Sequence, residues 1–487
     1  MQGKILFIKR HFLEIFLLIL AFSYYQYFAN KGIVLYDEGY YFHIADRIIH
    51  GQVAYRDFFL QFTPGYFYFF AFILKIFGEQ IIVGRFLTLV ICLAILFLIF
   101  RIADKLNFLK TYEKILIFLI AISFGFSLIN NPGILAWPAV FSSLLLVYFF
   151  SSWLKDKKII NLIPLGFSLA LIFAIKQHLG IYFFIITNFF IIYSAKEKVK
   201  SLIINDLFFF LPTALWISYF LINSGVSWIP EFINFNKNYL QVYSFSYPFF
   251  NLLFTKFGIF KLLPYYLPII LLAYLIYLFM KKKDIKNYFF PVVSIIGFFG
   301  TVLPTSDLLH VYPFYPLVLI SGLTFIKEKR IRKLWLGLVI ISIGIGFYLT
   351  FFREYYRYQP KYSLQNTDLK LNRTKDIEVD RPLSSDLTKV NNFIMDKTSK
   401  NDYILAYPFS PMLYFILERN NPSRYSIYYP GYLSNNQEME VISEMKMKKV
   451  KYVITRSNYK FKTPLSYFIS NKKIVFSAGT FKIFQIE

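Results

Sequence analysis

From residue 12 to residue 352, the chain is dominated by long apolar segments separated by shorter polar ones. A helix needs about 20 predominantly apolar residues to cross the hydrocarbon core of a bilayer. Segments of this kind, some interrupted by Pro or Gly, cover residues 12–29, 81–100, 115–130, 135–153, 159–175, 179–195, 203–222, 263–280, 288–304, 311–326 and 334–352. We therefore expect a polytopic α-helical membrane protein with about eleven transmembrane helices and with membrane lipids as partners.

The composition agrees with a membrane protein, because 57% of the 487 residues are hydrophobic, 21% are aromatic and the mean hydropathy is +0.49. Soluble globular chains are less apolar than this. The net charge of +25 could indicate nucleic-acid binding. The basic residues, however, gather in every second loop, which is the positive-inside pattern of membrane proteins. No nucleic acid is therefore expected as a partner.

The basic loops lie around residues 4–10, 101–114, 155–158, 196–200, 281–286 and 327–333. Loops rich in Lys and Arg face the cytoplasm. The pattern predicts an integral, multi-pass protein of the cytoplasmic membrane whose N-terminus is cytoplasmic. The loop of residues 30–80 is then extracytoplasmic, and an odd number of spans places the C-terminal tail on the same side.

Residues 353–487 follow a different pattern. Short strand patterns at 403–409, 424–429, 451–456, 473–479 and 481–487 are interspersed with helical patterns at 386–398, 411–419 and 438–447. This predicts a small soluble α/β domain with a partly parallel sheet. The chain thus divides into a transmembrane domain, 1–352, and an extracytoplasmic domain, 353–487. The latter contains no GxGxxG, P-loop or metal-ligand spacing, so we expect it to have a structural or acceptor-positioning role.

The first outer loop carries five of the seven acidic residues predicted on the outer side of the spans, namely Asp37, Glu38, Asp46, Asp57 and Glu79. An isolated Asp in a loop usually caps a helix. Here, aromatic residues surround the acids: Tyr36, Tyr40, Tyr41, Phe42, Tyr55, Phe58, Phe59, Phe62, Tyr66 and Phe67. We expect these rings to lie in the headgroup layer. Carboxylates held there are partly desolvated, which raises their basicity and suits them to accept a proton.

The loop reads Y-D-E-G-Y-Y-x-x-I-A-x-x-I-x-x-G-x-x-x-Y-R-D-F from Tyr36 and T-P-G-Y-F-Y-F-F-A-F-I-L-K-I-F-G from Thr63, and Gly84-Arg85-Phe86-Leu87 follows in the next span. This text resembles the GT-C superfamily of integral-membrane glycosyltransferases. Similar members are the family 39-like protein mannosyltransferases, the lipid A aminoarabinose transferases and the lipopolysaccharide-core transferases. The likeness covers residues 12 to about 105 well and the helical layout to residue 352 loosely.

The resemblance implies an enzyme of the cell envelope, a hexosyl- or pentosyltransferase whose sugar donor is carried on polyprenyl phosphate. It also implies inverting transfer on the outer face of the membrane to a glycolipid, polysaccharide or protein acceptor. The catalytic Asp of the family's first loop corresponds to Asp37. One departure concerns the donor phosphate: aminoarabinose transferases carry a Lys immediately before the Pro of this loop, where this chain has Thr63.

Sugar transfer from a lipid phosphate requires a base near the acceptor hydroxyl and positive charge near the leaving phosphate. We expect Asp37 to be the base, with Glu38 as a second catalytic candidate and with Asp57 and Tyr40 in supporting or acceptor-orienting positions. Candidates for binding the donor phosphate are Arg56, Arg85, Lys176 and His310. No metal cofactor is expected, because no Asp/Glu/His cluster beyond Asp37-Glu38 stands out, although a divalent metal remains open.

Other interpretations remain open for several of these features. Lys176 and His178 end an apolar helix, where ionisable groups commonly snorkel to the headgroups. A lone His such as His310 at a membrane boundary is commonly hydrogen-bonded. The aromatic outer loop 224–260 could anchor a helix in the headgroups or line an acceptor entrance.

The alternative function is that of a non-enzymatic transporter or flippase of a lipid-linked sugar. Against it, the chain shows no internal repeat. Its ionisable groups also gather on one side of the spans instead of at the membrane midplane, where a transporter binds its substrate.

Overall fold

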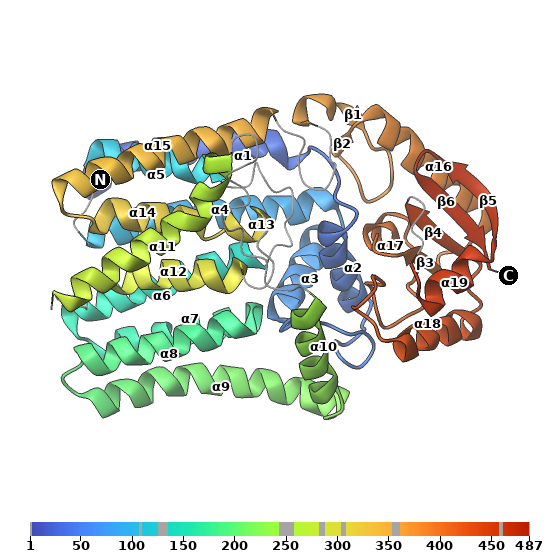
Figure 1. Ribbon diagram of the computed structural model, residues 1–487, viewed down its shortest axis with the longest axis horizontal. Coiled ribbons are helices and arrows are strands. Elements are labelled where there is room, and N and C mark those ends of the chain that lie inside the picture. Colours follow the sequence, from blue (N-terminus) through green and yellow to red (C-terminus); the bar gives the residue numbers. More distant parts are fainter. Residues whose placement is uncertain are drawn as a thin grey trace.

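Long helices lie side by side in a bundle that carries the C-terminal α/β part at one end (Figure 1). The computed structural model describes residues 2–106, 110–124, 135–242, 258–281, 288–302, 308–352, 361–456 and 461–486. Within these residues the bundle consists of α1 (Gln2–Ala29), α4 (Ile81–Lys105), α5 (Thr111–Phe124), α6 (Ala136–Asp156), α7 (Leu162–Ile175), α8 (Gln177–Ser194), α9 (Lys198–Ser224), α11 (Gly258–Met280), α12 (Phe289–Val302), α14 (Tyr315–Phe325) and α15 (Lys329–Phe352). Each predicted span coincides with one of these helices over the described residues, while residues 125–130 and 303–304 of two predicted spans lie outside them. The expected polytopic helical fold is confirmed.

Several of these helices can cross a membrane by length and composition. Among the described helices, seven are long and apolar enough to do so: α1, α4, α6, α8, α9, α11 and α15. Shorter apolar helices include α12, α14 and α7 together with the 3-10 turn before it, Ile159–Ile175. On α9, the side chains of Ile203, Leu207 and Phe210 are more than half exposed. Such a surface suits contact with hydrocarbon, as expected for a multi-pass membrane protein.

The two ends of the bundle differ. The domain end carries residues 30–80 and the C-terminal part, whereas the basic end carries the N-terminus and the last residues of α4, α6, α8 and α11 (Figure 1). Lys105, Lys155, Lys198, Lys281 and Lys329 all lie close to helix termini at the basic end. The alternation of lysine-rich and lysine-poor loops in the sequence therefore corresponds to the two ends of one bundle.

The segment between α1 and α4 forms two helices at the domain end, α2 (Asp37–Ile49) and α3 (Gly65–Phe77). The expectation that its aromatic residues lie in a headgroup layer was wrong for most of them. The following are buried inside the protein: Tyr40, Tyr41, Phe42, Tyr55, Phe58, Phe59, Tyr66 and Phe67. The physical reason is that α10 (Trp228–Val242) and the C-terminal part cover this segment and provide apolar contacts that the sequence does not reveal.

The C-terminal part contains a four-stranded sheet in the order β3-β4-β6-β5. β3 (Ile404–Tyr407) and β4 (Tyr452–Arg456) are parallel, whereas β6 (Phe481–Gln485) is antiparallel to both β4 and β5 (Lys473–Ala478), so the predicted partly parallel sheet is confirmed. The helices are α16 (Arg381–Lys397), α17 (Met412–Ile416), α18 (Asn435–Met447) and α19 (Pro464–Ser470). A 3-10 turn, Tyr362–Leu364, and the antiparallel pair β1 (Thr367–Asp368) and β2 (Glu378–Val379) precede them.

Two local predictions for this part differ from the structure. Residues 424–429 were predicted to form a strand but are irregular, and α19 was not predicted. The irregular segment makes its hydrogen bonds outside the sheet, since the Arg424 carbonyl accepts from the Phe59 N–H at 3.0 Å. Helix α18 was predicted over 438–447 and begins three residues earlier, at Asn435, because Ser434 and Gln437 form a capping box there.

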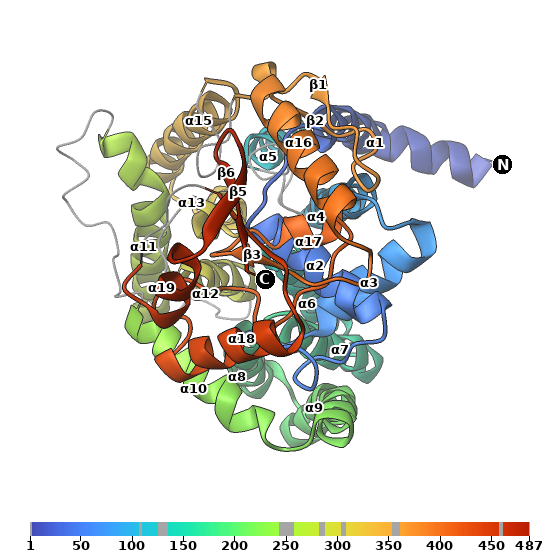
Figure 2. The ribbon, with the colours of Figure 1, turned by 90° about the vertical axis from the view of Figure 1, so that its right-hand side faces the viewer.

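The C-terminal part is locked onto the first outer loop. A Cβ on Gly39 would lie 2.2 Å from the Met412 backbone nitrogen, so only glycine lets α17 approach α2 this closely. The Met412 N–H donates to the Leu35 carbonyl at 3.2 Å. Figure 2 looks onto the domain end and shows α17 beside α2 near the centre of the molecule. One buried apolar core runs through both parts, so the C-terminal part helps to fix the position of α2.

Candidate active site

Asp37 is the first residue of α2 and is half-buried. The positive end of the α2 dipole favours its charged form. Burial, and in addition the nearby Asp37 carboxylate, raise the pKa of Tyr41 one turn along the helix. The ring of Tyr41 stacks on Phe67 with centroids 5.0 Å apart. Asp37 is thus a partly accessible carboxylate at a rigid helix end, beside a wall of aromatic rings, which is a suitable setting for a general base.

Glu38 faces the protein interior and forms a completely buried ion pair with Arg85, with Nε–Oε1 at 2.7 Å and Nη2–Oε2 at 3.0 Å. Arg85 makes three further hydrogen bonds to carbonyls between Ala29 and Gly32, so every N–H of its guanidinium is used. The Val34 N–H donates to Glu38 at 3.0 Å. This geometry does not support the roles expected from sequence, because it leaves Arg85 no donor for a phosphate and Glu38 no access to an acceptor. The pair instead fixes the chain between α1 and α2.

Arg373 of the C-terminal part binds two more acids of the loop, Asp46 at 2.7 Å and Glu79. Although Arg373 opposes the effect, burial raises the pKa of Asp46. These contacts tie the segment before α16 to α2 and to the end of the first outer loop. Asp46 and Glu79 therefore help to hold the C-terminal part in place.

Asp57 pairs with its neighbour Arg56 at 2.7 Å and accepts from the Val53 N–H at 2.7 Å. Burial opposes these contacts, but together they lower the pKa of Asp57. Asp57 follows the C-terminal end of α2, whose 13 residues span about 20 Å. The structure therefore places Asp57 and Arg56 away from Asp37. Their position does not support acceptor binding by Asp57 or phosphate binding by Arg56.

Lys176 forms the connection between α7 and α8 at the domain end. The sequence favoured a side chain that snorkels to the headgroups, whereas the structure leaves Lys176 only 8% exposed. In the part of the chain that the structure describes, its ammonium group has no carboxylate and no hydrogen-bond partner. Burial lowers its pKa to about 8. Because a buried, unpaired cation is unfavourable, this position is a candidate anion site.

The first outer loop packs against this connection. The Thr63 hydroxyl donates to the Phe173 carbonyl at 2.8 Å, and its N–H donates to Gln177 Oε1 at 3.2 Å. A Cβ on Gly65 would lie 2.7 Å from the Ala174 carbonyl, so glycine is needed for this approach. Lys176 thus lies next to the loop position at which the aminoarabinose transferases carry their lysine.

The remaining predicted residues also lie at the domain end. Tyr40 is buried, one turn after Asp37, with its ring 5.9 Å from that of Phe67 and 6.4 Å from that of Phe409. His310 is half-buried in the short helix α13 (Leu308–Val311), which packs against α12. The ring of His178 bonds to the Gly300 carbonyl at 2.8 Å and so joins α8 to α12. Asp37, Tyr40, Lys176 and His310 thus remain site candidates by location.

A trio of potential metal ligands, His11, Glu14 and Asp104, lies at the basic end. Arg101 binds both Glu14 and Asp104, and Lys114 also binds Glu14. Because these cations already neutralise the carboxylates, the group forms a structural ion network. It lies at the end of the bundle opposite Asp37.

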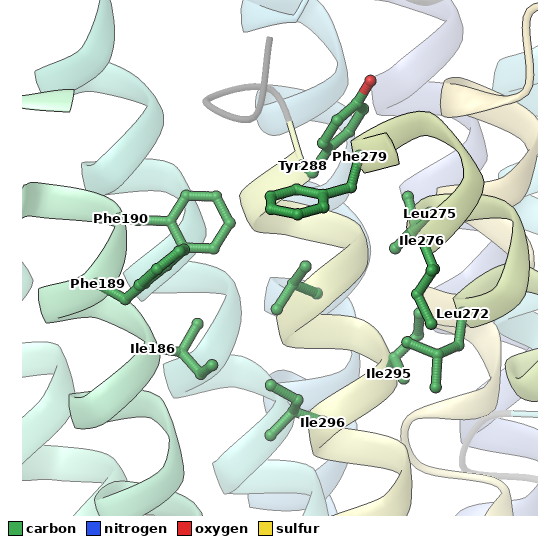
Figure 3. Close-up of a pocket in the computed structure, with 11 residues that line it drawn as sticks. Ile186, Phe189, Phe190, Leu272, Leu275, Ile276, Phe279, Tyr288, Ile295 and Ile296 are labelled. Carbon is green, nitrogen blue, oxygen red and sulfur yellow. The ribbon is translucent and has the colours of Figure 1, made fainter. Parts of the chain in front are cut away.

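An apolar pocket of about 260 Å³ lies between α8, α11 and α12 (Figure 3). Phe189 and Phe190 of α8 face Leu272 and Ile276 of α11 across it. Of the residues that line it, only Tyr288 carries a polar side-chain group. Such a pocket suits hydrocarbon and offers nothing to a phosphate or a sugar, so it is not the site of a transfer reaction.

Sequence reasoning missed the partners that shape this site. Gln177 adjoins Lys176, but nothing in the sequence indicates that it contacts Thr63. Likewise, no local signal places Met412 against Gly39. Both contacts join segments that are far apart in the chain, and only the folded structure brings them together.

The sequence matches no protein-family model and no curated protein. The structure is similar to the crystal structure of ArnT from Cupriavidus metallidurans bound to undecaprenyl phosphate, with a TM-score of 0.59. The match covers 98% of each chain at 11% sequence identity. It therefore extends over both the bundle and the C-terminal part, and it shows that the two chains share one overall fold.

Proposed function

We propose that this protein is an inverting glycosyltransferase that moves a hexose or pentose from a polyprenyl-phosphate donor to a glycolipid, polysaccharide or protein acceptor. The observation that carries the proposal is the buried ammonium of Lys176, which lacks a counter-ion among the described residues and lies at the ends of two apolar helices. The likeness to ArnT, which was crystallised with undecaprenyl phosphate, supports a lipid phosphate as the missing anion.

The location of Lys176 suits a phosphate whose lipid chain remains in the membrane. It lies where α7 and α8 meet at the domain end, so an anion there would be at the boundary of the apolar bundle. With a pKa of about 8, the side chain is mostly protonated at neutral pH. A cation already stripped of water interacts strongly with an anion, because little solvent has to be displaced when the two meet.

The proposed reaction is a single displacement. The Asp37 carboxylate takes the proton of the acceptor hydroxyl while the acceptor oxygen bonds to C1 of the sugar. The bond between C1 and the phosphate oxygen breaks, and polyprenyl phosphate leaves with the bonding electrons. Its negative charge is stabilised by the Lys176 ammonium, so no acid is needed for the leaving group. Attack from the face opposite the leaving phosphate inverts the configuration at C1.

The proposal places Asp37 and the C-terminal part on the outer side of the cytoplasmic membrane. It rests on the collection of Lys and Arg at the basic end, which the positive-inside rule assigns to the cytoplasm. A reporter that is active only in the cytoplasm should be silent when fused after Glu487 and active when fused before Met1. The reverse result would place Asp37 on the cytoplasmic side and refute this orientation.

Donor use tests the function directly. The purified protein in lipid nanodiscs should consume a polyprenyl-phosphate sugar, release polyprenyl phosphate and leave nucleotide sugars intact. Turnover of a nucleotide sugar without the lipid carrier would refute the proposal. So would stable binding and transbilayer movement of the lipid-linked sugar without chemical turnover, because that is the behaviour of a flippase.

A further inference from the structure

A small cavity lies between the first outer loop, α10 and the irregular segment of the C-terminal part. It encloses about 20 Å³, room for one water-sized group. The residues that line it include Tyr40, Phe59, Gln61, Phe235, Tyr425 and Ser426. Four separate segments of the chain supply these residues, so the cavity exists only in the folded protein.

Aromatic residues make up half of the lining: Tyr40, Phe59, Phe235 and Tyr425. The ring of Phe59 lies 4.8 Å from that of Phe235 and 6.2 Å from that of Tyr425. Aromatic faces of this kind pack against the C–H face of a sugar ring, while the few polar groups of a pocket fix the orientation of the ligand. The wall therefore offers the apolar part of a carbohydrate site.

Two buried polar atoms of the lining have no hydrogen-bond partner in the described structure: Gln61 Oε1 and Ser426 Oγ. Ser426 is only 5% exposed, so its hydroxyl is shielded from bulk solvent. Orphaned buried polar atoms are rare because they cost free energy, and a ligand can satisfy them. A hydroxyl group both donates and accepts, so it has the chemistry to satisfy an amide oxygen such as Gln61 Oε1 and a hydroxyl such as that of Ser426.

The charges near the cavity are already paired. Glu231 of α10 accepts from Arg424 at 3.0 Å and from the Tyr425 hydroxyl at 3.2 Å. The lining residues carry no cation that could bind a phosphate or a carboxylate. The chemistry of the site therefore fits a neutral hydroxyl on a ring and does not fit an anionic group.

The cavity also lies beside the reaction site proposed above. Tyr40 follows Asp37 by one helical turn, so their Cβ atoms are about 5–6 Å apart. The Gln61 carbonyl accepts from Gln177, the neighbour of Lys176, at 3.4 Å. A sugar ring that places one hydroxyl in the cavity would thus lie near the carboxylate and on the same side of the molecule as the ammonium.

We propose that this cavity is an acceptor subsite that binds one hydroxyl of a neutral sugar ring. The acceptor of the reaction is then a saccharide, and a protein side chain is not the acceptor. This inference rests on the proposed function, because the bound sugar is an acceptor only if the protein is a transferase. Binding of a neutral sugar, however, can be measured without any turnover. It also gives the irregular segment 424–429 a role, because a regular strand there would join the sheet and not line the cavity.

Two substitutions at one position test the subsite. Ser426→Ala removes the hydroxyl and enlarges the cavity, and we expect it to weaken sugar binding about three- to tenfold, the effect of one lost hydrogen bond. Ser426→Thr keeps the hydroxyl but adds a methyl group to a space that holds one water-sized group, and we expect it to abolish binding. The matched control is Ser194→Ala, which also removes a buried hydroxyl without a partner in the described residues, but at the basic end.

Saturation-transfer NMR on the full-length protein in nanodiscs provides the measurement. The probes are methyl β-glucopyranoside, methyl β-xylopyranoside, glucose 1-phosphate and a short blocked peptide that contains Ser and Thr. The subsite is supported if a methyl glycoside binds to the wild type and to Ser194→Ala, more weakly to Ser426→Ala and not to Ser426→Thr. It is overturned if no methyl glycoside binds, if Ser426→Thr binds as the wild type does, or if the peptide or the sugar phosphate is the probe that depends on Ser426.

Affinity for polyprenyl phosphate is measured in parallel and should not change in the Ser426 variants. This arm also separates the two proposals. If sugar binding is absent while the donor is turned over, only the subsite is refuted. If the donor is not turned over while sugar binding is present, only the transferase function is refuted.

Discussion

The two ends of the bundle differ in whether their buried charges are paired. At the basic end, Glu14 is bound by Arg101, Lys114 and His11, and each of these groups thereby has a partner. At the domain end, Lys176 is almost as buried but has no acid beside it in the described structure. Paired charges hold helices together, whereas an unpaired buried charge destabilises the fold unless an anion binds to it. Charge pairing therefore stabilises the basic end, whereas the domain end keeps a buried cation that makes it a candidate anion site.

The C-terminal part sharpens this contrast. Arginines bind four of the five acids of the first outer loop, through Arg85, Arg373 and Arg56. Two of these acids were candidates from the sequence, Glu38 as a second catalytic residue and Asp57 in a supporting position, and both are paired with an arginine. Asp37, which lies at the end of its helix beside Tyr41, is the acid of this loop that remains assigned to chemistry.

The largest effect is expected for Asp37→Asn, which keeps the shape of the side chain but removes its basicity. Loss of a general base typically lowers the rate by about 10²- to 10⁴-fold, while the melting temperature and donor affinity should stay near the wild type. The measurement is transfer rate at saturating donor. Asp57→Asn is the control, because Asp57 pairs with Arg56 away from the site. A folded, donor-bound Asp37→Asn with wild-type turnover would remove Asp37 from the mechanism.

The next effect concerns the basic end. Glu14→Gln removes the buried carboxylate that Arg101 and Lys114 share and leaves them, among the described residues, the partly exposed Asp104. Breaking a buried ion pair typically costs about 3–5 kcal/mol of stability, and the contacts to Asp104 offset part of this cost. We expect a clear fall in the melting temperature with unchanged donor affinity in the protein that stays folded. If Glu14→Gln instead weakened donor binding without a loss of stability, the assignment of the basic end to structure would be wrong.

Lys176→Met should weaken donor binding without lowering stability, the reverse of the effect expected for Glu14→Gln. A hydrogen bond to a charged group contributes about 1.5–3 kcal/mol, so the dissociation constant for polyprenyl phosphate should rise roughly 10- to 150-fold. Without donor, the variant should be as stable as the wild type or more stable, because a buried charge is removed. Titration calorimetry and thermal unfolding of the same preparation test both statements. Lower stability with unchanged affinity would make Lys176 a structural residue.

The smallest effect is the pH dependence of donor binding. Burial lowers the pKa of Lys176 from 10.5 to about 8, so the ammonium is present below pH 8 and is lost above it. Donor affinity of the wild type should therefore fall towards tenfold per pH unit above pH 8. In the absence of donor, the unfolded state binds more protons than the folded state between pH 8 and 10.5, so stability should rise with pH in that window. Lys176→Met should flatten both curves, and a pH dependence that persists in the variant would assign it to another group.

Much of the molecule was predictable because the signals are local. A run of about 20 apolar residues specifies a membrane helix wherever it occurs, and each of the eleven predicted spans coincides with a helix. The helical pattern at 438–447 and the strand patterns at 451–456 and 481–487 are equally local, and they lie in α18, β4 and β6. The exception, 424–429, has the residues of a strand but contacts the first outer loop in place of the sheet.

For the candidate site, too, the local features were predictable and the long-range contacts were not. The acidic, aromatic loop and its candidate base Asp37 were visible in the sequence by themselves, since a cluster of acids next to a membrane span stands out from its surroundings. Only the tertiary structure decided which charged side chains form ion pairs and which buried cation is a candidate to bind an anion. Arg85 binds Glu38, which is 47 positions away in the chain. Thr63 contacts Gln177, which is 114 positions away, and this contact brings Lys176 next to the loop position that Thr63 occupies. Desolvation and pairing depend on the neighbours that folding brings close, and those neighbours have no fixed spacing in the sequence.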